Sequence, residues 1–336
     1  MADPAGASST IPLLDRRLVI VTGKGGTGKT SVAAALALAG ARAGRRVLVA
    51  EVGRDEHASR LLAPGSAPAG YEGRLVRPGV TVMRIEPFDA LGEYLGLQLK
   101  LRAAVDLVLR NKAFRQLLEA APGWRELITL GKVWHLEQMQ GSDGRPRFDL
   151  IVIDAPATGH GLTFLDVPRV VVSAVQSGPL RRNAQLVEAM IGDRERTVLL
   201  PVALAEELPA RETIELVARV RRDVGIGIDR VVVNALVDAP FPAGLEDLDR
   251  RLARLPTGTK LPGLPSVRTL AACGAHLRSR HELNAHHRDE IARGTGLPIV
   301  PLPYLATGVR GPEQLERLGA ALVSEPSAQA AHGAVA

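Results

Sequence analysis

The sequence predicts an α/β domain with a mostly parallel central sheet, helices on both faces of that sheet and an inserted helical subdomain. The chain has 336 residues, of which 46% are hydrophobic but only 3% aromatic, so the core must be aliphatic. Short runs rich in Val and Ile alternate with helical patterns, which is typical of βαβ units. Because these runs lack polar alternation, we expect strands that are buried on both faces.

Seven aliphatic runs are the expected strands. The first is followed at once by a glycine-rich loop and then by an Ala- and Leu-rich helix over residues 30–43, which Gly44 ends. Strands that are separated by helices usually join one parallel sheet. The expected strands span residues 18–22, 47–52, 80–85, 150–153, 198–204, 230–235 and 298–302.

Two segments interrupt this alternation. From about residue 88 to residue 140 we find helical periodicity and no strand, with Leu101, Val105, Val108 and Leu109 on one helical face. This pattern predicts the helical insertion. A second segment, residues 240–287, carries prolines and arginines and shows little clear period.

The two ends of the chain are rich in small and polar residues. We expect residues 1–15 and 325–336 to be disordered, which leaves a single domain over residues 16–324. No basic segment followed by an apolar run opens the chain, and no stretch approaches 18 uninterrupted apolar residues. The prediction is a cytoplasmic protein without a transmembrane segment.

Composition excludes several classes of site. A single cysteine, Cys273, excludes an internal disulfide framework and any site within one chain that needs two thiolates. The formal charge is +6, but the arginines are scattered along the sequence rather than clustered. A nucleic-acid partner is therefore not expected.

The glycine-rich loop fits the pattern G-x-x-x-x-G-K-[ST] of a phosphate-binding loop, or P-loop. A strand precedes it and a helix follows, which makes the match credible. Glycines let successive backbone N–H groups point at phosphate oxygens, and the helix N-terminus adds partial positive charge. Lys29 is expected to reach the β- and γ-phosphates of ATP, and the Thr30 hydroxyl to bind Mg²⁺. The predicted loop residues are Gly23, Lys24, Gly25, Gly26, Thr27, Gly28, Lys29, Thr30 and Ser31.

An aspartate follows the strand at residues 150–153. Asp154, at the carboxyl end of a strand beside a P-loop, is well placed to hold Mg²⁺ or its water. Residues 154–165 read D-A-P-A-T-G-H-G-L-T-F-L. This run closely resembles the switch II motif D-T-A-P-T-G-H-T-L-R-x-L of the ArsA/Get3 family of ATPases.

The second lysine of the loop supports the same resemblance. G-K-G-G-T-G-K-T resembles the deviant Walker A loop of the SIMIBI class of P-loop NTPases. In that class, dimers enclose two nucleotides face to face, and the first lysine of each loop reaches the nucleotide of the partner. The resemblance implies that Lys24 acts in trans within a dimer.

Further motifs occur in family order, so that the resemblance runs from about residue 17 to residue 322. Residues 85–90, 122–126 and 209–213 resemble the stretches E-I-D-P-x-x-A and P-G-x-x-E and the segment that ends in E-T. The resemblance implies that Asn234 contacts the adenine of ATP and that the loop formed by Pro301, Leu302 and Pro303 packs on this base.

The sequence departs from the family at switch I. The family reads D-P-A-H-S-L there, and its Asp is the expected base that positions the attacking water. Gly53 stands in that place, and Glu51, Asp55 and Glu56 are nearby carboxylates. We take Glu51 as the replacement, so the predicted catalytic residues are Lys24, Lys29 and Glu51. Hydrolysis is then expected to be weak or to depend on a partner.

The family's known cargo sites are missing. Arsenite sites in ArsA-type pumps need a cysteine cluster, and the zinc site of eukaryotic Get3 dimers needs C-x-x-C; the chain has neither. Its four Met do not form a Met-rich groove, although a Leu/Val stripe that binds a hydrophobic client remains an alternative to plain core. His281, His286 and His287 have poor spacing for one helix face, so no metal site is expected there.

Three functions remain open. The main one is a targeting or chaperone-type ATPase, working as a homodimer or as a heterodimer with a related subunit. The altered switch I resembles bacterial Get3-like ATPases with paired, unequal subunits. A hydrophobic client or a membrane-associated partner is expected. A ParA/MinD-like positioning ATPase is the first alternative, and the T-G-H of switch II speaks against it. A non-hydrolysing regulatory subunit is the second, and Gly53 supports it.

Overall fold

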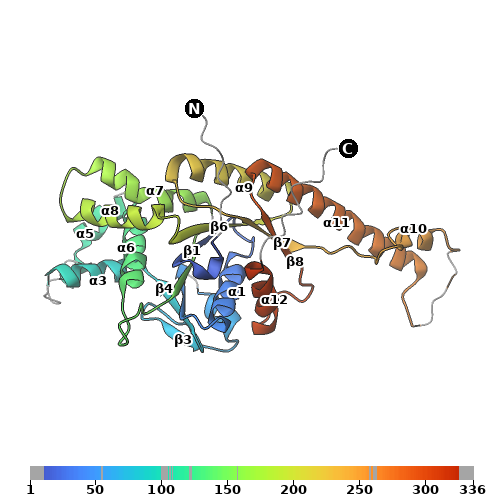
Figure 1. Ribbon diagram of the computed structural model, residues 1–336, viewed down its shortest axis with the longest axis horizontal. Helices are drawn as coiled ribbons and strands as arrows, with labels where there is room; N and C mark the ends of the chain where they lie inside the picture. Colours follow the sequence, from blue (N-terminus) through green and yellow to red (C-terminus); the bar gives the residue numbers. More distant parts are fainter. Residues whose placement is uncertain are drawn as a thin grey trace.

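The computed structural model describes residues 11–53, 56–99, 105, 107, 109–120, 123–156, 158–256, 259 and 263–324. One eight-stranded sheet lies between two layers of helices (Figure 1). The strand order is β3-β4-β2-β5-β1-β6-β7-β8. The strands are β1 (Leu18–Thr22), β2 (Val47–Val52), β3 (Arg74–Arg77), β4 (Val80–Ile85), β5 (Leu150–Asp154), β6 (Thr197–Leu204), β7 (Val231–Leu236) and β8 (Ile299–Pro303).

Helices connect the strands and fill both layers. They begin with the 3₁₀ turn η1 (Leu13–Asp15). The helices that follow are α1 (Lys29–Arg42), α2 (Ala58–Leu62), α3 (Pro87–Leu99), α5 (Lys112–Ala120), α6 (Trp124–Gln138), α7 (Thr158–Ala174), α8 (Pro179–Gly192), α9 (Glu207–Arg219), the π-helical turn η2 (Val220–Val224), α10 (Leu248–Ala253), α11 (Val267–Thr295) and α12 (Pro312–Val323).

All seven expected strands are present, and the described pairs are parallel except one. β3 pairs antiparallel with β4 at the edge of the sheet. The sequence analysis did not predict β3, because four residues with an arginine at each end show neither a continuous apolar run nor a useful alternation. A short charged strand of this kind suits an edge, since it discourages pairing with another chain.

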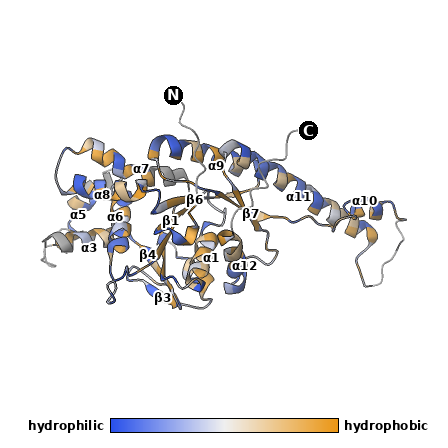
Figure 2. Ribbon diagram, viewed as in Figure 1, coloured by the Kyte–Doolittle hydropathy of each residue, from blue (hydrophilic) through white to orange (hydrophobic). Residues whose placement is uncertain are grey.

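The sheet buries a different set of side chains on each face. Val19, Val21 and their neighbours pack against α1 and α12, whereas Leu18, Ile20 and their neighbours pack against α6, α7 and α8. This alternation is the period of two that a strand imposes, here with apolar residues on both faces. Figure 2 shows the central strands, such as β1, β6 and β7, as mostly hydrophobic, between helices of mixed character. The prediction of an aliphatic three-layer α/β fold is confirmed.

The helical subdomain is larger than predicted. α3, α5 and α6 fall within residues 88–140 apart from the first residue of α3, but α7 and α8 lie beside them (Figure 1). Leu127 of α6, Val167 of α7 and Ala184 of α8 form one small buried cluster. The predicted insertion was therefore too short, because α7 and α8 show ordinary βαβ spacing in the sequence and join the subdomain only through packing. Leu101 and Val108 lie outside the described residues.

A long polar helix, α11, forms the last part of residues 240–287, the segment that was expected to be irregular. α11 has 29 residues, and with α10 it extends away from the sheet (Figure 1). Its few buried residues include Val267, Asn284 and Ile291, and they do not follow one apolar stripe. The interpretation of this segment as irregular was wrong for residues 248–253 and from residue 267 onwards, because a helix that projects into solvent needs no apolar period.

The described N-terminal residues also correct an expectation. Leu13 is 2% exposed and belongs to the core, so the prediction of disorder was wrong for residues 11–15. Residues 1–10 and 325–336 lie outside the described part of the chain. Among the helices that the structure describes, none combines the length and the apolar character needed to cross a membrane.

Candidate nucleotide site

The P-loop lies between β1 and α1, at the carboxyl edge of the sheet. Gly28 adopts a left-handed conformation, with φ of 91°, and a Cβ added there would come within 2.3 Å of Asn234 Nδ2. Gly26 is also left-handed, with φ of 85°, but no described atom lies within 4 Å of its Cβ position. Glycine is therefore required at both positions, and the loop leaves open space where phosphate would enter.

Asn234 braces this loop from β7. Its Nδ2 donates to the Thr27 carbonyl oxygen over 2.9 Å, and its Oδ1 accepts from the Ala235 amide. Ala235 has a positive φ of 58°, which marks a local irregularity of β7 beside the site, where the pairing with β8 shifts register. The expected adenine contact of Asn234 stays a prediction, while its contact with the P-loop is a role that sequence reasoning missed.

Lys29 is folded back into its own loop. Its Nζ donates to the Lys24 carbonyl oxygen over 3.1 Å. Burial lowers the pKa of Lys29, and the charge of Asp154 acts in the opposite direction. A partly buried ammonium with a backbone acceptor can turn to a phosphate oxygen without a large movement. The contact of Lys29 with the β- and γ-phosphates stays a prediction, and Ser31 is half-buried on the first turn of α1.

Thr30 and Asp154 form the expected pair at the ends of α1 and β5. Thr30 Oγ1 donates to Asp154 Oδ2 over 2.5 Å. Burial raises the pKa of Asp154, and the Thr30 hydrogen bond and the Lys29 charge oppose that rise. The second oxygen, Oδ1, is buried and accepts no hydrogen bond from any described residue. A buried, unpaired carboxylate oxygen beside a hydroxyl fits a hard cation such as Mg²⁺.

Glu51 lies beside Asp154 on the neighbouring strand. The two residues are partners in the parallel register of β2 and β5. Glu51 is 3% exposed, and its Oε1 accepts from the amides of His57 (2.8 Å) and Ala58 (3.0 Å). Its Oε2 is buried and finds no partner among the described residues. Burial raises the pKa of Glu51 to about 7.

The other switch I carboxylates are not equivalent to Glu51. Glu56 accepts hydrogen bonds from the amides of Ala69 (2.6 Å) and Gly70 (3.0 Å), so it closes a loop instead of facing the site. Asp55 lies outside the described residues. Gly53 directly follows β2 and has a φ of 150°, and within the described chain nothing comes within 4 Å of its Cβ position.

A cavity of about 330 Å³ opens beside Gly53, between the sheet and the helical subdomain. Pro156 of the predicted switch II lines it, together with Glu86 and Glu126. Ala157 and the side chains of residues 158–163 fall outside what the structure describes.

Lys24 takes a different path from Lys29. Its Nζ lies 2.5 Å from Glu212 Oε1, and the two side chains are 40% and 35% exposed. Glu212 belongs to α9, which is 188 residues further along the chain. Sequence reasoning placed Glu212 in the segment that ends in E-T but gave it no partner, since no local pattern links α9 to the P-loop.

The expected base-binding residues on β8 are only partly accessible. Pro301 and Pro303 are paired with Val233 and Leu236 of β7. Leu302 is fully buried in the core between the sheet and α12. A contact of ATP with this segment must therefore involve Pro301, Pro303 or the following loop and not the Leu302 side chain.

Comparison with known proteins agrees with this geometry. The family model of the anion-transporting ATPases matches residues 16–178. ATPase BagA of Mycobacterium tuberculosis is 32% identical over 311 residues, which cover 87% of this chain and 88% of that protein. ATPase GET3 of Chaetomium globosum is 26% identical over 345 residues, with coverage of 92% and 90%.

The match to a third relative covers a smaller part of both chains. The putative arsenical pump-driving ATPase of Halobacterium salinarum is 27% identical over 257 residues, or 70% of this chain and 38% of that protein. The matched region of the family model contains the P-loop, Glu51 and Asp154. With a P-loop between β1 and α1 and a relative similar over almost its whole length, this chain belongs to the ArsA/Get3 family of ATPases.

Proposed function

We propose that this chain is a Mg²⁺-dependent ATPase switch whose working unit is a dimer, with Lys24 of each subunit acting on the nucleotide of the other. The path of Lys24 carries the proposal. Its side chain leaves its own loop and ends in an ion pair at the surface. An exposed pair of this kind contributes about 0–1 kcal/mol, so Lys24 can exchange Glu212 for a phosphate at modest cost.

The other residues of the site have roles that follow from their positions. The loop amides, the N-terminus of α1 and Lys29 bind and orient the phosphates of ATP. Thr30 and Asp154 hold Mg²⁺, which supplies positive charge next to the phosphates when it is bound. Lys24 of the partner adds a further positive charge where negative charge grows during phosphoryl transfer.

Glu51 orients the attacking water in this proposal. Two backbone amides fix its Oε1, which leaves the buried Oε2 as a rigid acceptor beside Asp154. Its carboxylate starts from a strand position two residues before Gly53, so the water is held less directly than an Asp at switch I would hold it. Slow turnover is the expected consequence.

The helical subdomain offers a place for a hydrophobic client. A cavity of about 190 Å³ lies between α3, α6 and α8, and Trp134, Leu127 and Val187 line it. Leu180 at its edge is 47% exposed. Apolar walls with an exposed leucine suit the side chains of an apolar protein segment. Closure of a dimer would bring two such subdomains together, which couples nucleotide state to client binding.

Sedimentation of the purified chain tests the dimer. With Mg²⁺ and a non-hydrolysable ATP analogue we expect a dimer, and without nucleotide a monomer. Lys24→Ala should bind a fluorescent ATP analogue but stay monomeric, whereas Lys29→Ala should lose both properties. Lys112→Ala, which removes an exposed lysine of α5, is the matched control. A Lys24→Ala protein that dimerises like the wild type contradicts the proposal.

The same experiment distinguishes a homodimer from a heterodimer. If the isolated chain binds the analogue but remains a monomer, it is mixed with a related ATPase subunit recovered with the Asp154→Asn variant. Dimer formation that needs the second subunit and Lys24 identifies the heterodimer. If the chain dimerises neither with itself nor with the related subunit, the dimeric switch is excluded.

A non-hydrolysing regulatory subunit is the second candidate, and Gly53 favours it. No described side chain fills the space beside Gly53, so the usual water-positioning carboxylate is missing from the strand end. Phosphate release is measured under single-turnover conditions, with and without the partner subunit. A chain that binds ATP but releases no phosphate in either case is a regulatory subunit.

A further inference from the structure

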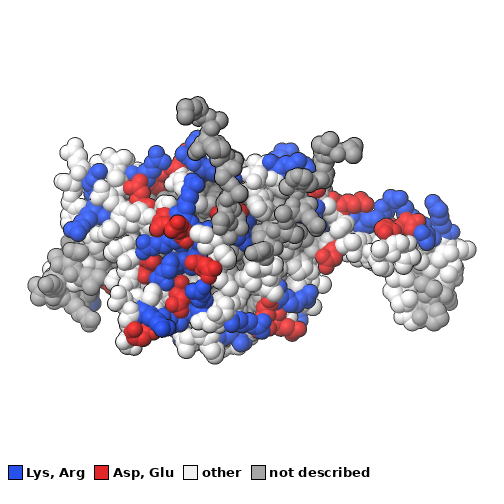
Figure 3. Space-filling view, viewed as in Figure 1, with Lys and Arg blue, Asp and Glu red and all other residues white. Residues whose placement is uncertain are grey.

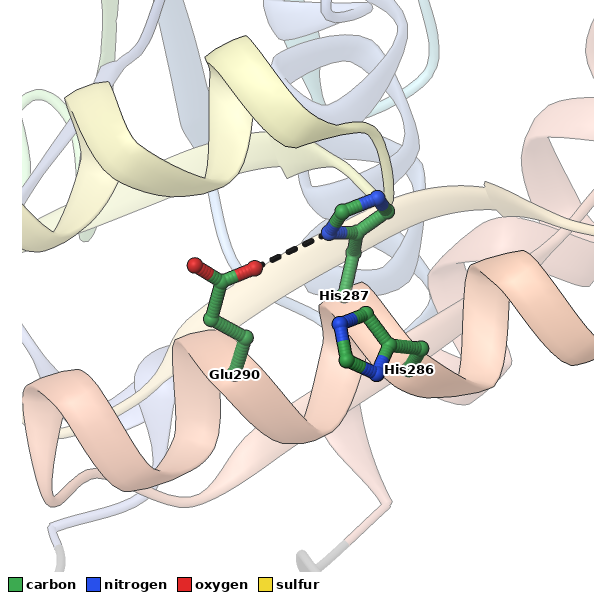
Figure 4. A group of neighbouring side chains, drawn as sticks. All are labelled: His286, His287 and Glu290. Atoms are coloured by element: carbon green, nitrogen blue, oxygen red, sulfur yellow. Dashed lines mark hydrogen bonds and ion pairs between the residues drawn. The ribbon is translucent and has the colours of Figure 1, made fainter.

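Three potential metal ligands converge on one side of α11. His287 Nδ1 lies 2.9 Å from Glu290 Oε2. The rings of His286 and His287 are perpendicular neighbours, with centroids 5.1 Å apart. One ligand atom from each of the three residues lies within 4.8 Å of the other two. Figure 4 shows the three side chains rising from adjacent turns of the same helix.

Helix geometry explains the convergence. Residues three and four apart are neighbours on a helix surface. Glu290 is three residues after His287 and four after His286. Both imidazoles therefore start one turn before Glu290. The Glu290 carboxylate leans towards them, because helical side chains point towards the N-terminus of the helix. The sequence-based expectation that no carboxylate completes a metal site here overlooked Glu290, although the spacing H-H-x-x-E contains the signal.

We propose that His286, His287 and Glu290 form a binding site for a divalent transition metal, with Zn²⁺ as the best match. Two imidazole nitrogens and one carboxylate oxygen form the set of three protein ligands, completed by water, that Zn²⁺ accepts. Hard cations such as Mg²⁺ prefer oxygen ligands, so the site differs in chemistry from the Thr30 and Asp154 pair.

The surroundings of the three residues favour a built site over a chance surface cluster. His287 is 7% exposed where α11 packs along α9, so its ring has little freedom. His287 Nδ1 is already within hydrogen-bond distance of Glu290 Oε2, so these two ligands are held side by side. His286 is exposed, so its ring is accessible beside them.

Arg211 limits the strength of the site. Its positive charge lies within electrostatic range of Glu290, but it is paired with Glu207 of the same helix over 3.0 Å. A neighbouring cation weakens the attraction for a second positive ion by an amount that water and salt reduce. Three ligands and one nearby cation predict reversible binding and not a permanently retained ion.

Calorimetric titration of the metal-free protein with Zn²⁺ tests the site, with excess Mg²⁺ present to occupy the P-loop. We expect one equivalent bound per chain. His286→Ala and Glu290→Gln should each weaken binding about a hundredfold or more, because even an outer-shell partner is worth about 10–100-fold. His276→Ala removes an exposed histidine of the same helix and should leave binding unchanged.

Two further variants test whether Zn²⁺ binds at a different place in the chain. Cys273 is exposed on the same helix, so Cys273→Ser tests whether the thiol binds the metal. Asp154→Asn tests whether Zn²⁺ enters the P-loop. Loss of binding in either of these variants, or wild-type affinity in Glu290→Gln, overturns the proposal. Co²⁺ substitution adds an optical test, since an intense visible band reports tetrahedral coordination, and its absence in His286→Ala is expected.

Discussion

At the scale of single residues, the two lysines of the P-loop differ in direction and not in chemistry. Lys29 donates to the backbone of its own loop, and Lys24 leaves the loop for Glu212. The two carboxylates of the site resemble each other, because Asp154 and Glu51 each keep one buried oxygen free of described partners. One oxygen of each carboxylate is fixed by hydrogen bonds, and the other can bind a ligand.

The first residue-scale prediction concerns Glu51. Glu51→Gln keeps an acceptor for the His57 and Ala58 amides but removes the negative charge that would orient water. We expect the single-turnover rate to fall at least about tenfold, as general-base assistance is typically worth 10²–10⁴-fold, while ATP affinity is retained. Phosphate release after rapid mixing measures the rate. An unchanged rate excludes Glu51 from catalysis.

The second residue-scale prediction concerns the contact that competes with dimer formation. Glu212→Ala removes the partner that holds Lys24 within its own subunit. Since exposed ion pairs contribute about 0.2–1 kcal/mol, the ATP concentration for half-maximal dimer formation should fall by about 1.4- to 5-fold. Sedimentation across a nucleotide series measures it. Weaker dimerisation would show that Glu212 supports Lys24 in the dimer as well.

At the scale of elements, packing decides where each helix belongs. α1 and α12 approach so closely that a Cβ on Gly319 would lie 2.7 Å from the Ala35 carbonyl oxygen. α3 and α6 are tied to the sheet by Glu93, which accepts from Tyr71 before β3 and from Lys132 on α6. The close approach of α12 fixes α1, the helix that follows the P-loop. The hydrogen bonds of Glu93 fix the helical subdomain.

Two helical glycines give a matched test of this packing. Gly319→Ala should lower the free energy of unfolding by about 1–3 kcal/mol, because the new methyl group meets backbone. Gly131→Ala on α6 should raise it by about 0.5–1 kcal/mol, because no described atom lies within 4 Å of the Cβ position and alanine favours a helix. Urea denaturation measures both. Equal effects would contradict the α1–α12 contact.

The Glu93 contact predicts a pH dependence. Burial raises the pKa of Glu93, but the hydrogen bonds from Lys132 and Tyr71 outweigh it and hold the pKa below its ordinary value of 4.5. A carboxylate with a lowered pKa stabilises the fold above pH 4.5, and this contribution is lost as the pH falls through its folded value.

Glu93→Gln should therefore destabilise the protein at pH 7 by about 1–2 kcal/mol, the range for hydrogen bonds to a charged group at a partly exposed position. The difference from the wild type should shrink as the pH falls below 4.5. Glu195→Gln, at an exposed position, is the control. Denaturation at several pH values provides the measurement, and a difference that does not change with pH would contradict the charged contact.

At the scale of the whole molecule, the nucleotide site lies between two projecting parts. The helical subdomain lies at one end of the long axis and the α10–α11 arm at the other (Figure 1). Figure 3 shows basic and acidic side chains mixed on the visible face, without the continuous cationic stripe that a nucleic-acid surface needs. The arrangement leaves both ends free for a second subunit or a client.

Nucleotide binding should stabilise the whole fold, because the loop proposed to bind ATP is held together by β1, α1 and Asn234. At 100 times the dissociation constant, Mg²⁺ and ATP should add about 2.7 kcal/mol to the free energy of unfolding. Lys29→Ala should abolish the gain, and Lys24→Ala should retain it at protein concentrations too low for dimers. Thermal denaturation measures each case; a gain that persists in Lys29→Ala would place ATP elsewhere.

The sequence by itself determined the P-loop and seven of the strands, because each is encoded by residues close together in the chain or by a short period. Thr30 and Asp154 lie 124 residues apart, and the fold brings them together. It also determined the family, through motifs in a common order. Tertiary structure decided what distant segments do together. The contact of Lys24 with Glu212, the burial of Glu51 and the addition of α7 and α8 to the helical subdomain depend on packing between elements. α11 carries no apolar period because most of it faces solvent, and only the folded helix brings Glu290 to the two histidines.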